Sequence, residues 1–305
     1  MSTAKPRLGF VGLGNMGAPM TNNLVKGGYS VTGFDVDRPR LLQRAQEIGF
    51  HAAESAIDCA RRSDIVITML PNGHIVRDAA LGANGIAEGL PKGSLIIDMS
   101  SAGATGTAAL GKELAAKGIT LLDAPVSGGV TGAEASTLAI MVGGDDEAAI
   151  ERAWPLLETM GKKLFRAGPL GAGHAAKSIN NYLGATNLIA ITEGLIAGTK
   201  FGLDPANLLA IINASTGSSG TSQGLFPGQV LNRKFGAGFA LALMAKDVGL
   251  AAELAQDVGM NAEVIAHTAK VWARARDTMP GNPDFTAIVQ MLETDFGTEL
   301  APPKA

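Results

Sequence analysis

The chain has 305 residues, enough for two domains of ordinary size, and its content of 46% hydrophobic and 17% charged residues excludes a disordered protein. A net charge of −3 gives no reason to expect nucleic acid or an anionic membrane as a partner, and the single cysteine, Cys59, excludes an intrachain disulfide. Because residues 1–7 lack a secretory pattern and the apolar stretch 183–198 is interrupted by Asn187 and Glu193, we expect a soluble cytoplasmic protein.

The first half of the chain alternates short β-branched runs with helix-length segments. Predicted strands cover residues 8–11, 30–34, 65–69, 95–97, 120–122 and 138–142, and the helices between them include 18–27 and 104–117. This alternation is typical of a mainly parallel sheet covered by helices on both faces. It predicts an α/β fold, with a Rossmann-type doubly wound sheet forming a first domain over residues 1–166.

The strand signal stops after Gly168, and only helical patterns follow. A very long helix is expected from about Gly173 to Lys200, and Asp204 then caps a helix with a proline at its first position. A Gly/Ser loop over 216–224 and helices near 239–256, 262–276 and 284–293 come next, and the tail 301–305 should be frayed. These patterns predict an all-helical second domain over residues 167–305.

A glycine motif, Gly12-Leu13-Gly14-Asn15-Met16-Gly17, follows the first predicted strand and opens a helix. This is the context that G-x-G-x-x-G requires for dinucleotide binding. Gly12 permits a tight turn, Gly14 lets the backbone approach a pyrophosphate, and Gly17 lets the helix pack on the strand. The helix N-terminus adds free N–H groups. We therefore expect residues 12–17 to bind the cofactor; the alternative is a glycine-rich turn without a ligand.

The second predicted strand ends at Asp35, which lies 18 residues after Gly17. A carboxylate at about this spacing accepts hydrogen bonds from the ribose hydroxyls and repels a 2′-phosphate, which favours NAD over NADP. Arg38 and Arg40 weaken this prediction, because an arginine can accommodate the phosphate. They can equally be solvated surface charges, so NADP stays possible.

Polar and glycine-rich residues also follow the later strands. Leu70 and Pro71 follow the third strand, Ser101 follows the fourth, and the run 127–129 follows the fifth. Ligands of open α/β sheets bind outside the carboxyl ends of the strands, so we expect Leu70, Pro71 and Ser101 to contact the cofactor. A serine hydroxyl beside glycine N–H groups, as in 127–129, suits a carboxylate. Each serine can also be an ordinary turn residue.

Lys177 lies in the first turns of an otherwise apolar helix, where a lysine is costly to bury. Desolvation or a neighbouring cation lowers the pKa of a lysine into the range of a general acid–base. Asn181, four residues later, shares its helical face, and Asn180 is a weaker candidate for the same role. The alternative is a lysine at a helix start that reaches solvent.

Four blocks of the sequence together resemble the β-hydroxyacid dehydrogenase family: GFVGLGNMG at 9–17, DAPVSGG at 123–129, GHAAKSINN at 173–181 and KD at 246–247. The resemblance extends over about residues 8–292. It implies hydride transfer between NAD(P) and C3 of a short 3-hydroxy acid. It also implies a helical domain that is entered by a long helix.

The resemblance further implies roles for individual residues. Lys177 would be the catalytic lysine, and Asn181 would position the substrate beside it. Ser127, Gly128 and Gly129 would form the substrate-binding loop, Lys246 would reach the cofactor and substrate, and Ser101 stands where the family usually has threonine. For Lys246 the alternative is a surface lysine paired with Asp247.

A 3-hydroxyisobutyrate dehydrogenase-like activity is therefore expected, with tartronate semialdehyde reductase or a related aldehyde-acid reductase as the alternative. An imine reductase of the same fold lacks a lysine at the position of Lys177. A non-catalytic nucleotide-binding module is disfavoured because Lys177, Asn181 and Lys246 are all present.

No spacing of the four histidines suggests a metal site; His174 is either structural or supports Lys177, and Cys59 is expected in the core. The segment 182–198 is apolar nearly all the way round and should be buried on most sides. It predicts a homodimer, or a homotetramer built from dimers, joined through the helical domains.

Overall fold

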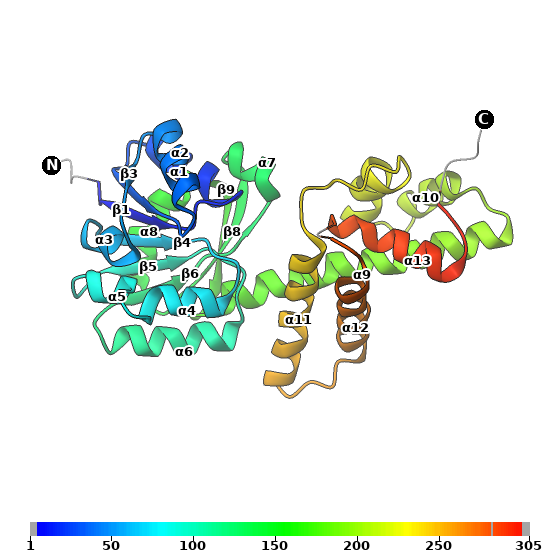
Figure 1. The fold of residues 1–305 in the computed structure, drawn as a ribbon. Coiled ribbons are helices and arrows are strands. Elements are labelled where there is room, and N and C mark those ends of the chain that lie inside the picture. Colours follow the sequence, from blue (N-terminus) through cyan, green and yellow to red (C-terminus); the bar gives the residue numbers. More distant parts are fainter. Residues whose placement is uncertain (1–4, 282, 301–305) are drawn as a thin grey trace. The chain divides into compact units, whose positions relative to one another are not determined.

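The computed structural model describes residues 5–281 and 283–300. The chain divides into two compact units, Met1–Lys177 and Ser178–Ala305, which Figure 1 draws from blue to green and from green to red. Within the described residues, every strand belongs to the first unit, and the second unit is helical. No helix in this part of the chain is long and apolar enough to cross a membrane.

The first unit is built on a nine-stranded sheet in the order β3-β2-β1-β4-β5-β6-β8-β7, with β9 also paired to β8. The strands are β1 (Leu8–Val11), β2 (Val31–Phe34), β3 (His51–Ala52), β4 (Ile65–Thr68), β5 (Leu95–Asp98), β6 (Thr120–Asp123), β7 (Val126–Ser127), β8 (Leu138–Gly143) and β9 (Gly161–Gly168). Neighbours from β3 to β6 are parallel, whereas β8 runs antiparallel to β6 and β7. The carboxyl ends of β1, β2, β4, β5 and β6 therefore lie along one edge of the sheet.

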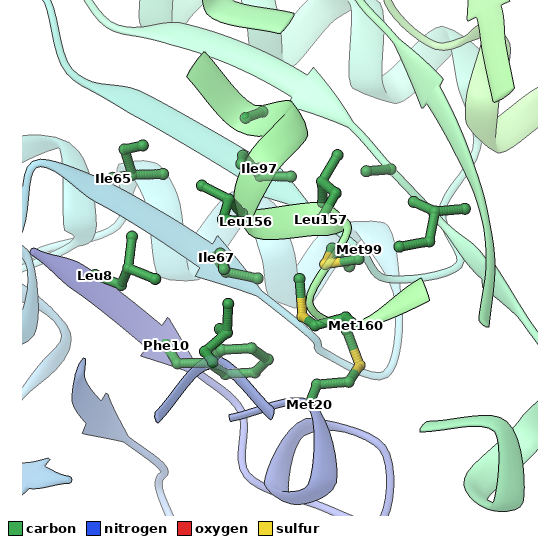
Figure 2. Close-up of a cluster of buried hydrophobic side chains, with 14 of the residues drawn as sticks. Leu8, Phe10, Met20, Ile65, Ile67, Ile97, Met99, Leu156, Leu157 and Met160 are labelled. Atoms are coloured by element: carbon green, nitrogen blue, oxygen red, sulfur yellow. The ribbon is translucent and has the colours of Figure 1, made fainter. Parts of the chain in front are cut away.

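Alternate residues of the strands pack into two cores, one on each face of the sheet. Figure 2 shows the first, in which Leu8, Phe10 and Ile67 pack with Met20 of α1 (Gly17–Lys26) and Leu156 of α8 (Glu147–Leu157). The second core lies under α3 (Ala56–Arg61), α4 (Gly73–Leu81), α5 (Ile86–Gly89) and α6 (Ala104–Ala115). Because both faces are covered, the central strands are apolar throughout.

The second unit is built around the long helix α9 (Ala172–Phe201), which starts in the first unit. It also contains α10 (Pro205–Asn213), the π-helical segment η1 (Thr221–Val230), α11 (Leu241–Asp257), α12 (Glu263–Thr278), the 3₁₀ turn η2 (Phe285–Ala287) and α13 (Ile288–Phe296). Trp272 is fully buried in this core and stacks on Phe285 with ring centroids 6.5 Å apart. The Asp204 side chain accepts from the backbone N–H of Asn207 at 2.8 Å, which confirms the predicted helix cap.

The predicted fold class is confirmed, and the six predicted strands match observed strands to within one residue at each end. Strand β9 was not predicted, because it pairs only with β8 and most of its side chains are exposed, so it lacks an apolar pattern. The predicted loop 216–224 is wrong from Thr221 onward, where η1 begins. Ser219 and Ser222 exchange hydrogen bonds at 2.8 and 3.1 Å and cap this segment as a helix start. The tail 301–305 lies outside the described residues.

Candidate active site

The glycine motif forms the turn between β1 and α1. Gly12 has a φ of +100°, and a Cβ at this position would lie 2.3 Å from the carbonyl oxygen of Met69. A Cβ on Gly17 would lie 1.9 Å from the carbonyl oxygen of Gly12. Both glycines are therefore required by the fold itself, since any side chain there would overlap with backbone.

Gly14 is different, because a Cβ at this position would meet only Nη1 of Arg40, at 4.0 Å. The fold therefore leaves a space beside Gly14 that even a methyl group would begin to fill. Asn15 is exposed, and the side chain of Met16, the residue before α1, does not cap the helix. An open space beside the uncapped N–H groups at the start of α1 fits the pyrophosphate of NAD(P).

Asp35 lies directly after β2 and is only 9% exposed. Its Oδ2 accepts from the backbone N–H of Leu13 at 2.7 Å, and its Oδ1 accepts from the N–H of Asp37 at 2.9 Å. These bonds fix the carboxylate against the glycine motif. Each oxygen keeps a further lone pair, so Asp35 can still accept from ribose hydroxyls.

The two arginines beyond Asp35 have different partners. Arg38 donates to the carbonyl oxygen of Ala53 at 3.0 Å and to Glu54 at 2.7 Å. Arg40 donates to Asp37 at 2.8 Å, and its Nη2 lies 3.7 Å from Oδ1 of Asp35. Only Arg40 therefore lies beside the glycine motif, and there it is paired with carboxylates.

The loops that follow β4 and β5 are joined by a buried serine. The hydroxyl of Ser100 accepts from the backbone N–H of Leu70 at 2.9 Å. Leu70 is half-buried, Pro71 is exposed and Ser101 is half-buried. Ser101 was predicted to contact the cofactor, whereas Ser100 was not, because its 0% exposure could not be inferred from the sequence.

The run 127–129 lies between β7 and α7 (Gly129–Glu134). Ser127 is half-buried, whereas Gly128 and Gly129 are exposed, with φ values of +134° and +63°. A Cβ on Gly129 would meet nothing within 4 Å. The loop thus leaves bare backbone and open space beside a serine hydroxyl, an arrangement that suits a small anionic group.

A buried carboxylate from β6 holds the start of α9. Asp123 is 0% exposed, and its two oxygens accept from the backbone N–H groups of Gly171 and His174, at 2.7 Å each. A Cβ on Gly173 would lie 2.8 Å from Oδ2 of Asp123, so the helix backbone packs directly against this side chain. Lys177, which is half-buried, follows His174 by three residues. The start of the Lys177 helix is therefore attached to the same edge of the sheet as the glycine motif.

In the helical unit, Asn181 and Lys246 share a buried partner. Asn181 is 9% exposed and donates from Nδ2 to Oδ2 of Asp247 at 2.6 Å. Nζ of Lys246 lies 3.1 Å from the other oxygen, Oδ1. The pairing of Lys246 with Asp247 is therefore observed. The carboxylate of Asp247, however, is only 1% exposed, so the pair is not a surface pair.

Both halves of the chain resemble known proteins. Residues 7–168 match the family described as the NAD binding domain of 6-phosphogluconate dehydrogenase, and residues 171–292 match the NAD-binding domain of NADP-dependent 3-hydroxyisobutyrate dehydrogenase. The chain is 36% identical over 295 residues to 2-(hydroxymethyl)glutarate dehydrogenase of Eubacterium barkeri, and the match covers 97% of each chain. It is 41% identical over 257 residues to 3-hydroxyisobutyrate dehydrogenase of Pseudomonas aeruginosa, covering 82% of this chain and 86% of the relative.

A solved structure of Mycobacterium tuberculosis 3-hydroxyisobutyrate dehydrogenase with L-serine is 38% identical, with a TM-score of 0.87 over 95% of this chain and 99% of that one. This chain belongs to the β-hydroxyacid dehydrogenase family. As a β-hydroxyacid dehydrogenase, it is an NAD(P)-dependent oxidoreductase that acts on a CH–OH group. Among its described residues, no group of three His, Cys, Asp or Glu side chains could hold a metal ion.

The predicted site residues of this β-hydroxyacid dehydrogenase divide between its two units. The first unit brings the residues before Ser178 to the carboxyl edge of the sheet, and the second holds Asn181 with Lys246. Their roles stay predictions. The sequence did not predict the buried carboxylate of Asp123, and it placed Asp247 beside Lys246 on the surface rather than in the core. Each stands inside a block that carried the resemblance, which was the available signal.

Proposed function

We propose that this enzyme oxidises the C3 hydroxyl of a short 3-hydroxy acid to an aldehyde, in the manner of a 3-hydroxyisobutyrate dehydrogenase. One observation carries the proposal: Asp123 ties the first turn of the Lys177 helix to the sheet edge that bears the glycine motif. A lysine amine at that edge lies on the side of the sheet where open α/β folds bind their ligands.

The names of the relatives point to one substrate chemistry. The two curated relatives are named for 3-hydroxyisobutyrate and 2-(hydroxymethyl)glutarate, and the solved structure is described with L-serine. All three molecules are 3-hydroxypropanoates that carry a substituent on C2: a methyl, a carboxyethyl or an amino group. The proposed substrate is therefore a 2-substituted 3-hydroxypropanoate. Glycerate, whose oxidation gives tartronate semialdehyde, is the alternative of the same class.

Each predicted residue has a distinct task in this reaction. Bound NAD(P) would supply the hydride acceptor. Lys177 takes the proton of the C3 hydroxyl at Nζ as the alcohol becomes an aldehyde, and it returns that proton in the reverse direction. Ser127, with the N–H groups of Gly128 and Gly129, holds the substrate carboxylate. Asn181 positions the substrate, and Lys246 binds cofactor and substrate.

A panel of 2-substituted 3-hydroxypropanoates, assayed for NADH formation, tests the proposal. The panel contains 3-hydroxyisobutyrate, 2-(hydroxymethyl)glutarate, L-serine and glycerate. Oxidation of at least one supports the proposed class, and the order of kcat/KM identifies the C2 substituent. No oxidation of any, while NADH still binds, would favour a non-catalytic nucleotide-binding module.

Lys177→Ala tests the role of the lysine. Turnover should fall by roughly two to four powers of ten, the usual span for a lost general acid–base. The affinity for NADH, measured by fluorescence titration, should not change. Lys162→Ala, at an exposed lysine of β9, is the matched control and should keep full activity. Near-normal turnover of Lys177→Ala would refute the assignment.

For the cofactor we propose NAD in preference to NADP, although one matching family is described as NADP-dependent. Asp35 presents a buried carboxylate beside the glycine motif, and Arg40 is already paired with Asp37. Both features disfavour a 2′-phosphate. Asp35→Ala should narrow the ratio of kcat/KM for NAD over NADP, whereas Arg38→Ala should leave it unchanged. A parent enzyme that prefers NADP would contradict the argument.

We also propose a homodimer, or a tetramer of dimers, joined through the helical domain. Helix α9 exposes a stripe of apolar and small residues at Leu183, Ala190, Gly194 and Ala197. A Cβ on Gly194 would meet nothing within 4 Å, so a second helix could approach closely. A second copy of the chain is the simplest cover for such a stripe. Light scattering after size exclusion should give a multiple of the single-chain mass of 31.1 kDa. Ala190→Arg should shift the measured mass toward that of a single chain.

The domain limits and the location complete the proposal. We assign residues 1–166 to dinucleotide binding and residues 167–305 to substrate binding and oligomerisation. A cytoplasmic location is proposed because the single cysteine, Cys59, is buried and reduced, which suits a reducing compartment.

A further inference from the structure

A cluster of buried polar side chains lies at the carboxyl edge of the sheet in the first unit. Thr68, Asp98 and Asp123 stand at the ends of β4, β5 and β6, Thr107 lies on α6, and His174 lies on the first turn of α9. All five are at most 5% exposed. Buried carboxylates and an imidazole are costly unless they are hydrogen-bonded, so the partners of each group decide what the cluster does.

Both carboxylates have fixed partners. Asp98 accepts at Oδ1 from the hydroxyl of Thr68 at 2.8 Å and from the backbone N–H of Ser100 at 3.1 Å. Asp123 accepts from the backbone N–H groups at the start of α9, including that of His174. Asp98 therefore joins the ends of β4 and β5, and Asp123 joins β6 to the helix that carries Lys177.

The ring of His174 lies between the two carboxylates. Its Nδ1 is 2.8 Å from the hydroxyl oxygen of Thr107 and 3.9 Å from Oδ2 of Asp123, and its Nε2 is 3.7 Å from Oδ2 of Asp98. Nε2 is buried and has no hydrogen-bond partner among the described residues. The ring thus approaches Asp98 without a hydrogen bond, and its only side-chain hydrogen bond among the described residues is the one with Thr107.

The hydroxyl of Thr107 has a single hydrogen, and it donates this hydrogen to the carbonyl oxygen of Gly103 at 3.0 Å. The oxygen of Thr107 therefore accepts from Nδ1 of His174 at 2.8 Å. His174 thus joins α9 to α6 through this hydrogen bond, and its other ring nitrogen lies against Asp98 at the end of β5.

We propose that His174 is a positioning residue that sets the placement of Lys177 relative to the cofactor loops. Ser100, which donates its N–H to Asp98, also accepts at its hydroxyl from the N–H of Leu70 in the loop after β4. Asp98 thus connects this loop to the ring of His174, and Lys177 lies three residues later on the same helix. The inference rests on the proposed role of Lys177 as the acid–base.

Loss of the contact between His174 and Asp98 should reduce kcat rather than the affinity for NADH. A misplacement of a reacting group by about 1 Å can cost a hundredfold in rate. His174→Leu keeps an apolar side chain of similar size but removes both ring nitrogens. We expect it to lower kcat by about 10- to 100-fold, with the dissociation constant for NADH changed by less than about 2-fold.

Two conservative variants separate the two sides of the ring. His174→Asn places an amide near the position of Nδ1, where it can meet Thr107, and His174→Gln extends an amide toward Asp98. His174→Gln should recover most of the lost kcat, whereas His174→Asn should resemble His174→Leu, because the contact with Asp98 is the one that reaches the cofactor loop. Equal activity of all three variants would overturn the proposal.

A double-mutant cycle with Lys177→Ala decides whether His174 acts through the lysine. In the Lys177→Ala background, His174→Leu should reduce the residual kcat by less than about 2-fold, because there is no lysine left to misplace. A full 10-fold loss in that background would overturn the inference. If Lys177→Ala alone keeps normal turnover, the proposed function has failed instead, so the two failures are distinguishable.

Hydrogen exchange gives a readout that is independent of activity. The amides of residues 174–178 should exchange faster in the apo form of His174→Leu than in the parent, while those of the sheet do not change. His174→Gln should restore the protection of these amides against exchange. A variant that loses kcat with unchanged exchange at 174–178 would contradict positioning through the first turn of α9.

Discussion

Gly14 and Gly17 belong to the same motif, but they should respond to alanine in opposite ways. A Cβ on Gly17 would lie 1.9 Å from the carbonyl oxygen of Gly12, whereas a Cβ on Gly14 would meet only the mobile end of Arg40 at 4.0 Å. Gly14 also lacks a positive φ, so alanine adopts its conformation without strain. We therefore predict that Gly17→Ala damages the fold and that Gly14→Ala damages only cofactor binding.

The magnitudes follow from these contacts. At Gly17 the methyl group would overlap with backbone by well over an ångström, and overpacking of this kind costs about 1–3 kcal/mol or more. Such a loss lowers the midpoint of thermal unfolding by roughly 2–4 °C for each kcal/mol. At Gly14, alanine should leave that midpoint unchanged or raise it slightly, because it restricts the unfolded chain. The methyl group would keep the pyrophosphate from the backbone, and the affinity for NADH should fall at least about tenfold, or about 1.4 kcal/mol.

Two measurements on each purified variant test this prediction: thermal unfolding without cofactor and a fluorescence titration with NADH. Gly106→Ala is a matched control, since a Cβ there meets nothing within 4 Å and the residue belongs to α6 rather than to the motif. If Gly14→Ala binds NADH as tightly as the parent, the space beside Gly14 does not hold the pyrophosphate. The fit of the dinucleotide to this turn would then be refuted.

Two further predictions concern stability. Burial raises the pKa of the Cys59 thiol to about 12, so the folded protein should not react with a thiol reagent at pH 8 until it unfolds; rapid reaction would contradict its burial. Because an unfolded thiol ionises near pH 8.5, stability should fall as the pH rises from about 9 toward 12, and Cys59→Ala should reduce this slope in alkaline denaturation curves. Arg233 forms a double hydrogen bond with the buried Glu293, at 2.5 and 2.9 Å. Arg233→Met should therefore cost about 2–4 kcal/mol in denaturant unfolding, against about 0–1 for Arg274→Met at an exposed pair; equal losses would refute the role of burial.

The parts of this structure that the sequence predicted are those set by local patterns. The strands β1 and β4 are short apolar runs, and the glycine motif between β1 and α1 needs its residues for turn geometry that is local. The start of α10 follows from one Asp-Pro pair. In each of these cases the physical cause lies within a few residues of the effect, so a reading along the chain can find it.

The parts that were missed depend on partners far along the chain. β9 is a strand because β8 lies beside it, and its own residues are mostly polar and exposed. Ser100 holds a loop 30 residues away, and the amide of Asn181 bonds a carboxylate 66 residues away. Burial of Asp123 and Asp247 is a tertiary property that no spacing reveals. The residues that hold the site in place were therefore harder to predict than those that would perform the chemistry.

The blocks that carry the family resemblance contain both kinds of residue. In 123–129 and 173–181, Ser127 and Lys177 have functional groups suited to the reaction, whereas Asp123 and Gly173 are needed to join β6 to α9. A lysine transplanted into another helix start would have the same functional group but not this attachment. Since the rate of proton transfer depends on placement within about an ångström, the attachment is as much a part of the motif as the amine. A test of Lys177 alone therefore measures only half of what the motif encodes, and the His174 variants address the other half.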